Sequence, residues 1–411
     1  MTVAPWAGFA LGVLVVLGTV ASVAATMVVP RGLRSRLAAV VQAAVTGVFR
    51  VLASRRADYE DRDRLLSLAG PVVLLALVVT WIGGIYAGFA LLMWPFADSL
   101  PTAFSAAGSS MFTLGFAVPH GSAPTALTFL AAGFGLVVVA LQIAYLPTLY
   151  GAFNRREQLV TMLESRGGVP AWGPEILARH ELIDNTASLG WLYTQWEQWA
   201  ADLAETHTTY QMLILFRSPH PLRSWVTALL SVLDAGALHL ALNPYSAPPE
   251  ARPFMRMGYM ALREVATVMR IPFNPDPKPD DDVLLTREEF DEALAELTSV
   301  GWRPEREADE AWVHFRGWRV TYEGIAWAVA DRVDAPPALW SGPRHRFGKA
   351  AMAPARPPHR SPSPERKAVM AITAQRRERR PISVSGRRRA AVDADEARAE
   401  AADAAAEQPA D

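Results

Sequence analysis

Residues 101–153 contain a short apolar segment, a Thr-Leu-Gly-Phe turn and a long apolar segment, in that order. The first segment is too short to cross a bilayer, because a membrane helix needs about 20 apolar residues. The second segment is long enough. Non-helical backbone at membrane depth is tolerated only where protein buries it or where it lines a wet cavity. The order therefore favours an integral membrane protein in which a half-helix and an extended loop precede a spanning helix.

Two other segments, residues 8–29 and 65–94, are also long enough to span a membrane. The first would suit a secretory signal as well, because small residues at 21–25 resemble a cleavage point. However, no Lys or Arg precedes this segment, and it is long for the apolar part of a signal. We therefore expect a retained membrane helix at residues 8–29.

Residues 37–53 place their apolar side chains on one helical face and are flanked by Arg at both ends. If this helix spanned the membrane, its basic flanks would lie on opposite sides, against the positive-inside tendency. An amphipathic helix on the inner leaflet fits the pattern and completes an N-terminal unit of residues 1–64. A helix packed on a cytoplasmic domain is the alternative.

The distribution of basic residues predicts the orientation. Residues 95–124 contain no Lys or Arg, whereas Arg is frequent in residues 31–64 and after residue 153. Because Lys and Arg favour the cytoplasmic side, we expect residues 95–124 and the N-terminus outside the cell. The prediction is a multi-pass protein of the plasma membrane with its C-terminal part in the cytoplasm.

Residues 154–342 are more polar and are predicted to form a mostly helical cytoplasmic domain. Apolar residues at helical spacing predict one long helix over 174–216 and shorter helices at 222–242 and 252–270. The sequence Thr286-Arg-Glu-Glu is typical of a capping box that opens a further helix.

Residues 343–411 are rich in Pro, Arg and Ala. We expect this tail to be disordered, because it has too little apolar surface to offset the entropy of ordering. Its basic block would suit anionic lipid or nucleic acid. A solvated tail explains the same composition, and no nucleic-acid partner is expected.

The chain carries no recognisable catalytic or metal pattern. It contains no Cys, which excludes disulfides, thiolate nucleophiles and Cys-based metal sites. The histidines at 180, 207, 220 and 239 have no ligand spacing, and no phosphate-binding Gly loop or nucleophile elbow occurs. We therefore expect neither an enzyme nor a cofactor.

Residues 109–117 read Ser-Ser-Met-Phe-Thr-Leu-Gly-Phe-Ala and resemble the pore helix and selectivity filter of two-transmembrane potassium channels. The filter of that family reads TVGYG followed by Asp. Its first four positions are matched in kind by Thr113, Leu114, Gly115 and Phe116.

The wider stretch of residues 65–165 is similar to bacterial ion-channel proteins of the two-pore-domain type. The resemblance implies an all-α integral membrane protein with a pore-loop module at residues 65–153. In this module the outer helix would be 65–94, the pore helix and filter 100–118, and the inner helix 123–150.

Two positions depart from the family pattern. Ala117 stands where the filter has its second Gly, and Val118 stands where it has Asp. A left-handed backbone at Ala117 would cost roughly 1–2 kcal/mol. The missing carboxylate removes a negative charge from the outer mouth, so the predicted filter is degenerate.

The resemblance gives several residues a physical role. Ser99 and Pro101 suit the start of the pore helix, on which Ser109 and Ser110 lie. The C-terminal end of that helix would point at the pore centre, where its dipole favours a cation. Carbonyl groups of residues 113–117 from four chains would replace the hydration shell of an ion. Gly115 is where the backbone most needs to avoid a Cβ.

In the predicted inner helix, Gly133, Gly135 and Pro147 would permit a bend or gate. The alternative for the two glycines is close packing between helices. Gln142 would face either a cavity or a neighbouring helix.

The expected function is a homotetrameric, potassium-type pore for a monovalent cation in a lipid bilayer, regulated by its cytoplasmic domain. The only metal expected is the permeant cation. A non-conducting, membrane-anchored sensor or interaction protein is the alternative, in which residues 101–118 are simply a re-entrant segment.

Overall fold

The structure, a computed structural model, describes residues 3–29, 35–117 and 120–342. It is 75% helix, and no strand occurs in the described ranges, so the all-α prediction is confirmed. Val118 of the predicted filter and the tail at 343–411 lie outside the described residues.

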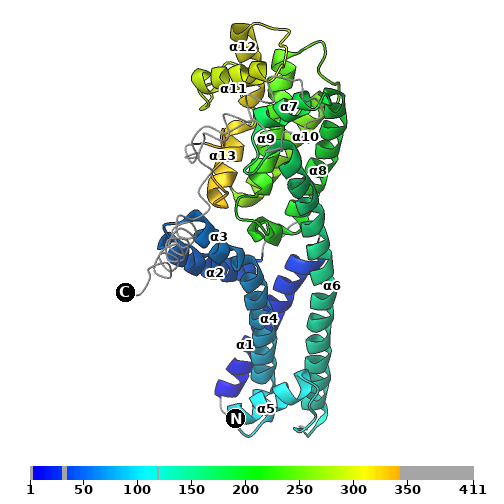
Figure 1. Cartoon of the computed structure of the whole chain (residues 1–411). Helices are drawn as coiled ribbons and strands as arrows, with labels where there is room; N and C mark the ends of the chain where they lie inside the picture. Colours follow the sequence, from blue (N-terminus) through cyan, green and yellow to red (C-terminus); the bar gives the residue numbers. More distant parts are fainter. Residues whose placement is uncertain (1–2, 30–34, 118–119, 343–411) are drawn as a thin grey trace, which may run out of the picture.

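Five helical stretches of the described chain are long and apolar enough to cross a membrane. Three of them form a bundle at one end of the molecule (Figure 1): α1 (Val3–Val23) with the π-helical turn Ala24–Val28, α4 (Ala69–Met93) and α6 (Ser122–Gly167). The other two are α2 (Arg36–Ser54) and α9 (Trp225–Leu242). Several helices of the described chain could therefore cross a membrane.

Glycines bring α1 and α4 close together. A Cβ added at Gly12 would lie 2.8 Å from the carbonyl oxygen of Gly88, and one at Gly88 would lie 2.6 Å from Cγ2 of Val16. Gly84 approaches Thr19 in the same way. Small residues four apart allow membrane helices to pack with their backbones in contact. α1 therefore packs along the helix that precedes the predicted pore segment.

The short helix α5 (Leu100–Met111) crosses the end of the bundle between α4 and α6 (Figure 1). It begins as the sequence predicts, because the hydroxyl of Ser99 accepts a hydrogen bond from the N–H of Thr102 at 3.4 Å and Pro101 lies in the first turn. Residues 112–117, which follow α5, are non-helical.

α6 is one helix of 46 residues, much longer than the inner helix predicted at 123–150. At 1.5 Å per residue its length is about 69 Å, more than twice the hydrocarbon thickness of a bilayer. Pro147 lies inside α6 without ending it. α6 therefore extends from the end near α5 into the second part of the molecule (Figure 1).

We call α7–α13 the helical domain. Its buried apolar side chains form one core together with Val160 and Leu163 of α6. Besides α9, the helices are α7 (Gly173–Leu182), α8 (Leu189–Thr209), α10 (Ala251–Met269), α11 (Arg287–Ser299), α12 (Ala308–Arg319) and α13 (Glu323–Arg332). Every residue of α9 is buried, so α9 is the central helix of this core.

The single helix predicted over 174–216 is wrong. α7 ends at Leu182, Asp184 has a φ of +53°, and α8 begins only at Leu189. A residue in the left-handed conformation commonly ends an α-helix. The apolar spacing continues across the break because both helices bury a face in the same core.

Other local predictions are confirmed. The helices predicted at 222–242 and 252–270 are α9 and α10. The capping box is present: the hydroxyl of Thr286 accepts a hydrogen bond from the N–H of Glu289 at 3.2 Å, and the Glu289 carboxylate accepts one from the N–H of Thr286 at 2.9 Å.

α2 lies at the junction between the bundle and the helical domain, next to the short helix α3 (Tyr59–Ser67) (Figure 1). One face of α2, formed by Leu37, Val41 and Val45, packs on an apolar cluster that includes Leu77 of α4. The large apolar side chains of α2 that stay more than half exposed are Val40, Val48 and Val51.

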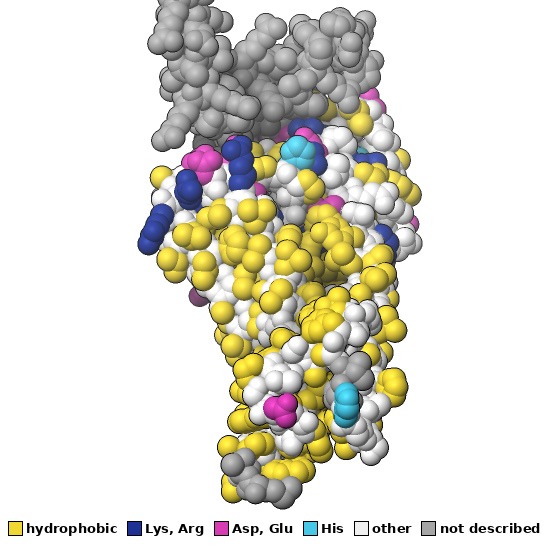
Figure 2. All heavy atoms as spheres, turned by 90° about the horizontal axis from the view of Figure 1, so that it is seen from below, with side chains coloured by type: hydrophobic (Ala, Val, Ile, Leu, Met, Phe, Trp, Pro, Cys, Tyr) yellow, Lys and Arg dark blue, Asp and Glu magenta, His cyan; other side chains and the backbone are white. Residues whose placement is uncertain are grey.

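The bundle has an apolar surface. Leu14 of α1, Val79 of α4 and Phe129 of α6 are each about 70% exposed. Figure 2 shows hydrophobic side chains over most of the visible face, with Lys and Arg gathered toward one side. A surface of this kind requires lipid or another protein to cover it.

Candidate functional site

The loop after α5 is held against that helix by one serine. The N–H groups of Leu114 and Gly115 both donate to the carbonyl oxygen of Ser109, at 2.8 and 3.3 Å. The N–H of Ala117 donates to the Ser109 hydroxyl at 2.9 Å. Ser109 itself is 1% exposed. We call residues 113–117 the Ser109 loop.

This hydrogen bonding fixes the direction of the loop carbonyls. In a trans peptide the N–H and the preceding C=O point in opposite directions. Because three N–H groups of the loop point toward α5, the carbonyls of Thr113, Leu114 and Phe116 point away from it. The loop therefore presents a row of carbonyl oxygens on the side opposite to α5.

Left-handed residues produce this one-sided arrangement. Thr113 has a φ of +57° and Gly115 a φ of +73°. Left-handed residues that alternate along the chain turn successive N–H groups to one side. Gly115 adopts this conformation at no steric cost, as predicted.

The strain expected at Ala117 lies at Thr113 instead. Ala117 does not have a positive φ, whereas Thr113 does. A left-handed conformation is rare for a β-branched residue and costs about 1–2 kcal/mol. Backbone strain of this size persists only where the surrounding contacts fix the conformation, and it is frequent at functional sites.

The electrostatics around the loop favour a cation. The C-terminal end of α5 carries the negative end of the helix dipole, equivalent to about half an elementary charge. It lies directly before the loop, at Met111. The sequence contains no Lys or Arg between residues 65 and 154, so no basic side chain of this stretch offsets the dipole.

The second predicted pore-helix serine has a different role. The hydroxyl of Ser110 donates to the carbonyl oxygen of Ala106, one turn earlier in α5, at 2.9 Å. It makes a bond within its own helix, whereas Ser109 bonds to the loop.

The residues that were singled out in the predicted inner helix have different surroundings in the structure. A Cβ at Gly135 would lie 2.6 Å from the carbonyl oxygen of Met111, so Gly135 lets α6 pack against the end of α5. Gly133 has open space around it. Pro147 is exposed three turns further along. Gln142 contacts Met27 of the α1 π-turn, with 3.7 Å between Nε2 and Sδ.

A second group of contacts joins α6 to the helical domain. Arg156 is 2% exposed, and its guanidinium donates to the carbonyl oxygens of Leu213 and Phe216 at 2.9 and 2.7 Å. It also pairs with the buried carboxylate of Glu157 at 2.8 Å. We call residues 211–217 the junction segment.

His207 completes the environment of Arg156. Its Nε2 lies 3.2 Å from Nη1 of Arg156, and because a guanidinium can only donate, Nε2 accepts this bond. Nδ1 then carries the proton and donates to the carbonyl oxygen of Leu203 at 3.0 Å. Burial, together with the charge of Arg156, holds the pKa of His207 well below its ordinary value, so the ring is neutral.

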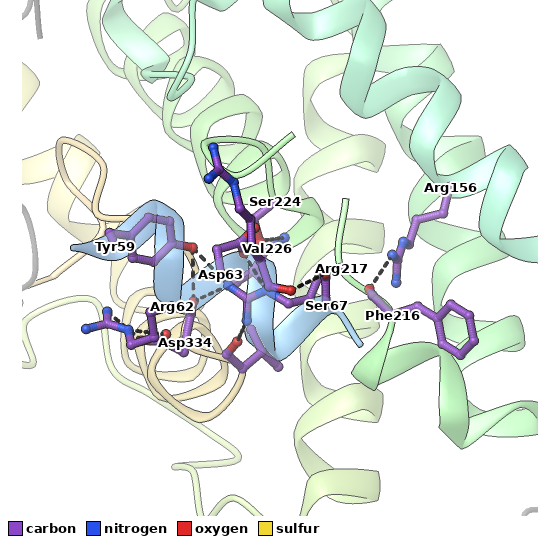
Figure 3. A network of polar contacts seen from close by, with 12 residues as sticks. Tyr59, Arg62, Asp63, Ser67, Arg156, Phe216, Arg217, Ser224, Val226 and Asp334 are labelled. Carbon is purple, nitrogen blue, oxygen red and sulfur yellow. Dashed lines mark hydrogen bonds and ion pairs between the residues drawn. The ribbon is translucent and has the colours of Figure 1, made fainter. Parts of the chain in front are cut away.

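The end of the junction segment contacts α3. Arg217 donates from Nε to Asp63 at 2.5 Å and from Nη2 to the hydroxyl of Tyr59 at 2.9 Å. It also donates to the carbonyl oxygen of Asp334, after α13, at 2.7 Å. Arg62 pairs with the Asp334 carboxylate at 2.8 Å. Figure 3 shows these side chains converging from α3, the junction segment and the end of the helical domain.

Phe216 lies between the two helices that flank α5 in sequence. Its ring centroid is 5.8 Å from those of Tyr150 and Phe153 of α6. At the start of α4, a Cβ on Gly70 would lie 3.1 Å from the same ring. The junction segment therefore contacts α3, α4 and α6.

Sequence reasoning did not predict the junction residues. In the sequence, Arg156 is only one of the Arg residues that follow residue 153, and Phe216 is only the last residue of the helix predicted over 174–216. The available signal was Arg156 itself, because the chain continues with helical periodicity through it. A charged residue inside such a pattern indicates a buried, bonded side chain as well as a solvated one.

No group of three or more His, Asp or Glu side chains in residues 3–29, 35–117 and 120–342 could hold a metal ion. Comparison of the chain with known protein families, with curated proteins and with solved structures finds no match.

Proposed function

We propose that the chain is one subunit of a homotetrameric cation pore in the plasma membrane. The observation that carries the proposal is the row of carbonyl oxygens that the Ser109 loop presents away from α5. Carbonyl oxygens from several chains around one axis can replace the hydration shell of a monovalent cation. The negative end of the α5 dipole adds to this attraction.

The exposed apolar residues of the loop support an assembly. Leu114 and Phe116 are 64% and 66% exposed in the single chain. Large apolar side chains exposed beside a row of polar carbonyls need cover. In a tetramer the neighbouring subunits would supply it, while the carbonyls line the axis.

The orientation follows from the charges. The stretch without Lys or Arg between residues 65 and 154 includes α4, α5 and the Ser109 loop, whereas Arg residues gather near α2 and at the end of α6. The positive-inside tendency then places α5 outside and the helical domain in the cytoplasm.

The helical domain acts on the pore through α6. Arg156 and Phe216 connect the junction segment to α6, which contacts the end of α5 at Gly135. A movement of the domain would be transmitted along one continuous helix to the loop. Pro147 removes one backbone hydrogen bond from α6 and marks where it bends most easily.

The loop favours weak selectivity. Ala117 has no left-handed φ, and Asp98 is the sole acidic residue between 65 and 154. Fewer aligned carbonyls and no carboxylate directly after the filter distinguish potassium from sodium poorly. We therefore expect a pore for monovalent cations that is less selective than the potassium channels it resembles.

Cation flux into liposomes containing the purified full-length chain tests the proposal. Gly115→Ala should abolish the flux, because φ is +73° at this position. Gly324→Ala is the control: it lies in α13 of the helical domain with nothing within 4 Å of the added Cβ, so its flux should equal that of the wild type.

The mass of the particle in mild detergent gives an independent check. A tetramer is expected, and a monomer would contradict the pore. A tetramer without flux under varied voltage and pH would favour the alternative, a membrane-anchored sensor whose working part is the helical domain.

A further inference from the structure

A cavity of about 390 Å³ lies at the junction of the membrane bundle and the helical domain. Its walls come from α2, the start of α4, α6, the junction segment and the ends of α10 and α13. None of the residues of the Ser109 loop takes part in it.

One wall of the cavity is polar. Gln42, Thr46 and Arg50 follow one another at four-residue spacing on α2 and line the cavity. The small residues Ala39 and Ala43 of the same helix also line it. Small side chains on this wall leave space rather than fill it.

The opposite wall is largely apolar. It is formed by Leu77 of α4, Tyr145 of α6, and Met212 and Leu215 of the junction segment. Met269, at the end of α10, extends it. The cavity therefore combines a polar wall and an apolar wall, which is the lining expected for an amphipathic ligand.

The charge available in the cavity is positive. Four charged residues line it: Arg50, Arg217, Arg332 and Asp334. Arg217 is bonded to Asp63, and Asp334 is bonded to Arg62. Among the described residues, Arg50 and Arg332 form no ion pair; Arg50 makes one 3.5 Å contact, to the carbonyl oxygen of Arg332.

With α2 on the inner leaflet, as its sequence predicts, this cavity would lie at the surface of the membrane. The face of α2 with Val40, Val48 and Val51 is exposed, and it differs from the face that lines the cavity. A helix with one exposed apolar face and flanking Arg residues lies at the lipid interface. Basic pockets between helices at that depth on the cytoplasmic side bind anionic lipid headgroups.

We propose that the cavity binds an anionic amphiphile, a membrane phospholipid whose phosphate contacts Arg50 and whose acyl chain lies along Leu77 and Met212. The phosphate satisfies the unpaired guanidinium, and the side-chain amide of Gln42 donates a further hydrogen bond to it. Because Met212 and Leu215 belong to the junction segment, the bound lipid contacts the same segment that Arg156 and Arg217 hold.

Binding is measured on the purified full-length chain in detergent, without any flux, so its outcome is independent of the proposed pore. The probes are dioleoyl-phosphatidylglycerol, dioleoyl-phosphatidylcholine and soluble glycerol phosphate. Phosphatidylglycerol should raise Tm with a saturable concentration dependence that gives an apparent Kd. Phosphatidylcholine should give a smaller increase.

Three variants in and next to α2 locate the site. Arg50→Gln should weaken phosphatidylglycerol binding about five-fold, the effect expected for one basic residue at a membrane surface. Arg55→Gln is the matched control, because Arg55 caps the same helix but does not line the cavity. Its affinity should equal that of the wild type. Ala43→Trp should abolish binding by filling the space.

Other outcomes would overturn the proposal. Equal weakening by Arg50→Gln and Arg55→Gln would mean that the whole basic surface attracts the lipid, with no specific cavity. If glycerol phosphate raised Tm at the same concentration as the lipid, the site would be one for a soluble phosphate. If Ala43→Trp fails to fold, the comparison of Arg50→Gln with Arg55→Gln still decides between these outcomes.

Discussion

Nη2 of Arg156 and the carbonyl oxygen of Phe216 are 2.7 Å apart, joined by a hydrogen bond that α6 donates to the junction segment. The guanidinium is buried, and the ring of the same Phe216 packs on Phe153 one turn earlier in α6. One residue of the helical domain is thus bound to α6 by both a charged group and an aromatic contact.

Replacing Arg156 should unfold the junction. Arg156→Met removes both carbonyl contacts and leaves the Glu157 carboxylate buried without its partner. Removing one partner of a buried ion pair costs about 3–5 kcal/mol. Thermal unfolding of the purified chain should show a clear fall in Tm.

Arg155→Met is the neighbouring control. Arg155 is 58% exposed and pairs with Asp202 at the surface. Such exposed pairs contribute under about 1 kcal/mol. An equal fall in Tm for Arg155→Met and Arg156→Met would mean that the buried contacts of Arg156 are not important for stability.

Ser109 should be necessary for the loop, and Ser110 should not. Ser109→Ala removes the acceptor of the Ala117 N–H, a hydrogen bond that contributes about 1 kcal/mol. We expect a several-fold loss of cation flux in liposomes with an unchanged particle mass. Ser110→Ala removes only a bond within α5, and its flux should be close to that of the wild type. A larger loss of flux in Ser110→Ala than in Ser109→Ala would contradict the role of Ser109 in holding the loop.

The packing of α1 on α4 should be sensitive to single methyl groups. Gly12→Ala places a Cβ 2.8 Å from a backbone oxygen of α4, which cannot move aside as a side chain can. Overpacking of this kind costs about 1–3 kcal/mol. Gly18→Ala, in the same helix but with nothing within 4 Å, should leave Tm unchanged. The measurement is thermal unfolding in the same detergent for both variants.

Stability should fall as the pH falls below neutrality. Burial lowers the pKa of His239 from 6.5 to about 4. The unfolded chain therefore binds this proton first, and the stability that the neutral ring contributes is lost between pH 6.5 and about 4. The full effect is about 3 kcal/mol. His207, whose pKa is also lowered by burial, acts in the same direction.

Asp234 opposes this trend. Burial raises its pKa from 3.8 to about 6, against the attraction of Arg319. For this group the folded chain binds the proton first, so its contribution is lost as the pH rises from about 4 to 6. Asp234→Asn should therefore steepen the acid loss of stability, and His239→Gln should flatten it. Chemical denaturation at several pH values between 4 and 7.5 measures how the free energy of unfolding of each variant depends on pH. The same pH dependence in the wild type and both variants would contradict the pKa shifts of His239 and Asp234.

The predicted elements with strong local signals are present in the structure. The sequence predicts α4 and α6 as helices that are long and apolar enough to cross a membrane, and Ser99 and Thr286 act as caps. Gly115 has a positive φ, a backbone conformation that glycine adopts without strain. In each case the physical cause lies within a few neighbouring residues.

The features that sequence alone did not reveal depend on distant contacts. The continuation of α6 to Gly167 is stabilised by the buried bonds of Arg156 to residues more than 50 positions away. The break at Asp184 is permitted because α7 and α8 then pack on α9 separately. The role of Ser109 depends on the fold of the loop, since Ser110 beside it carries the same chemistry.

The complete burial of α9 has a consequence for the biosynthesis of the chain. This helix is long and apolar enough to enter a bilayer, yet it is the core of the helical domain. While the chain is being made, α9 emerges after α6 and its protein partners α7 and α8, so these can cover it before lipid does. α10 and α12, which also pack on it, are synthesised later. Whether protein or lipid covers a helix as apolar as α9 therefore depends on how early α7 and α8 pack on it.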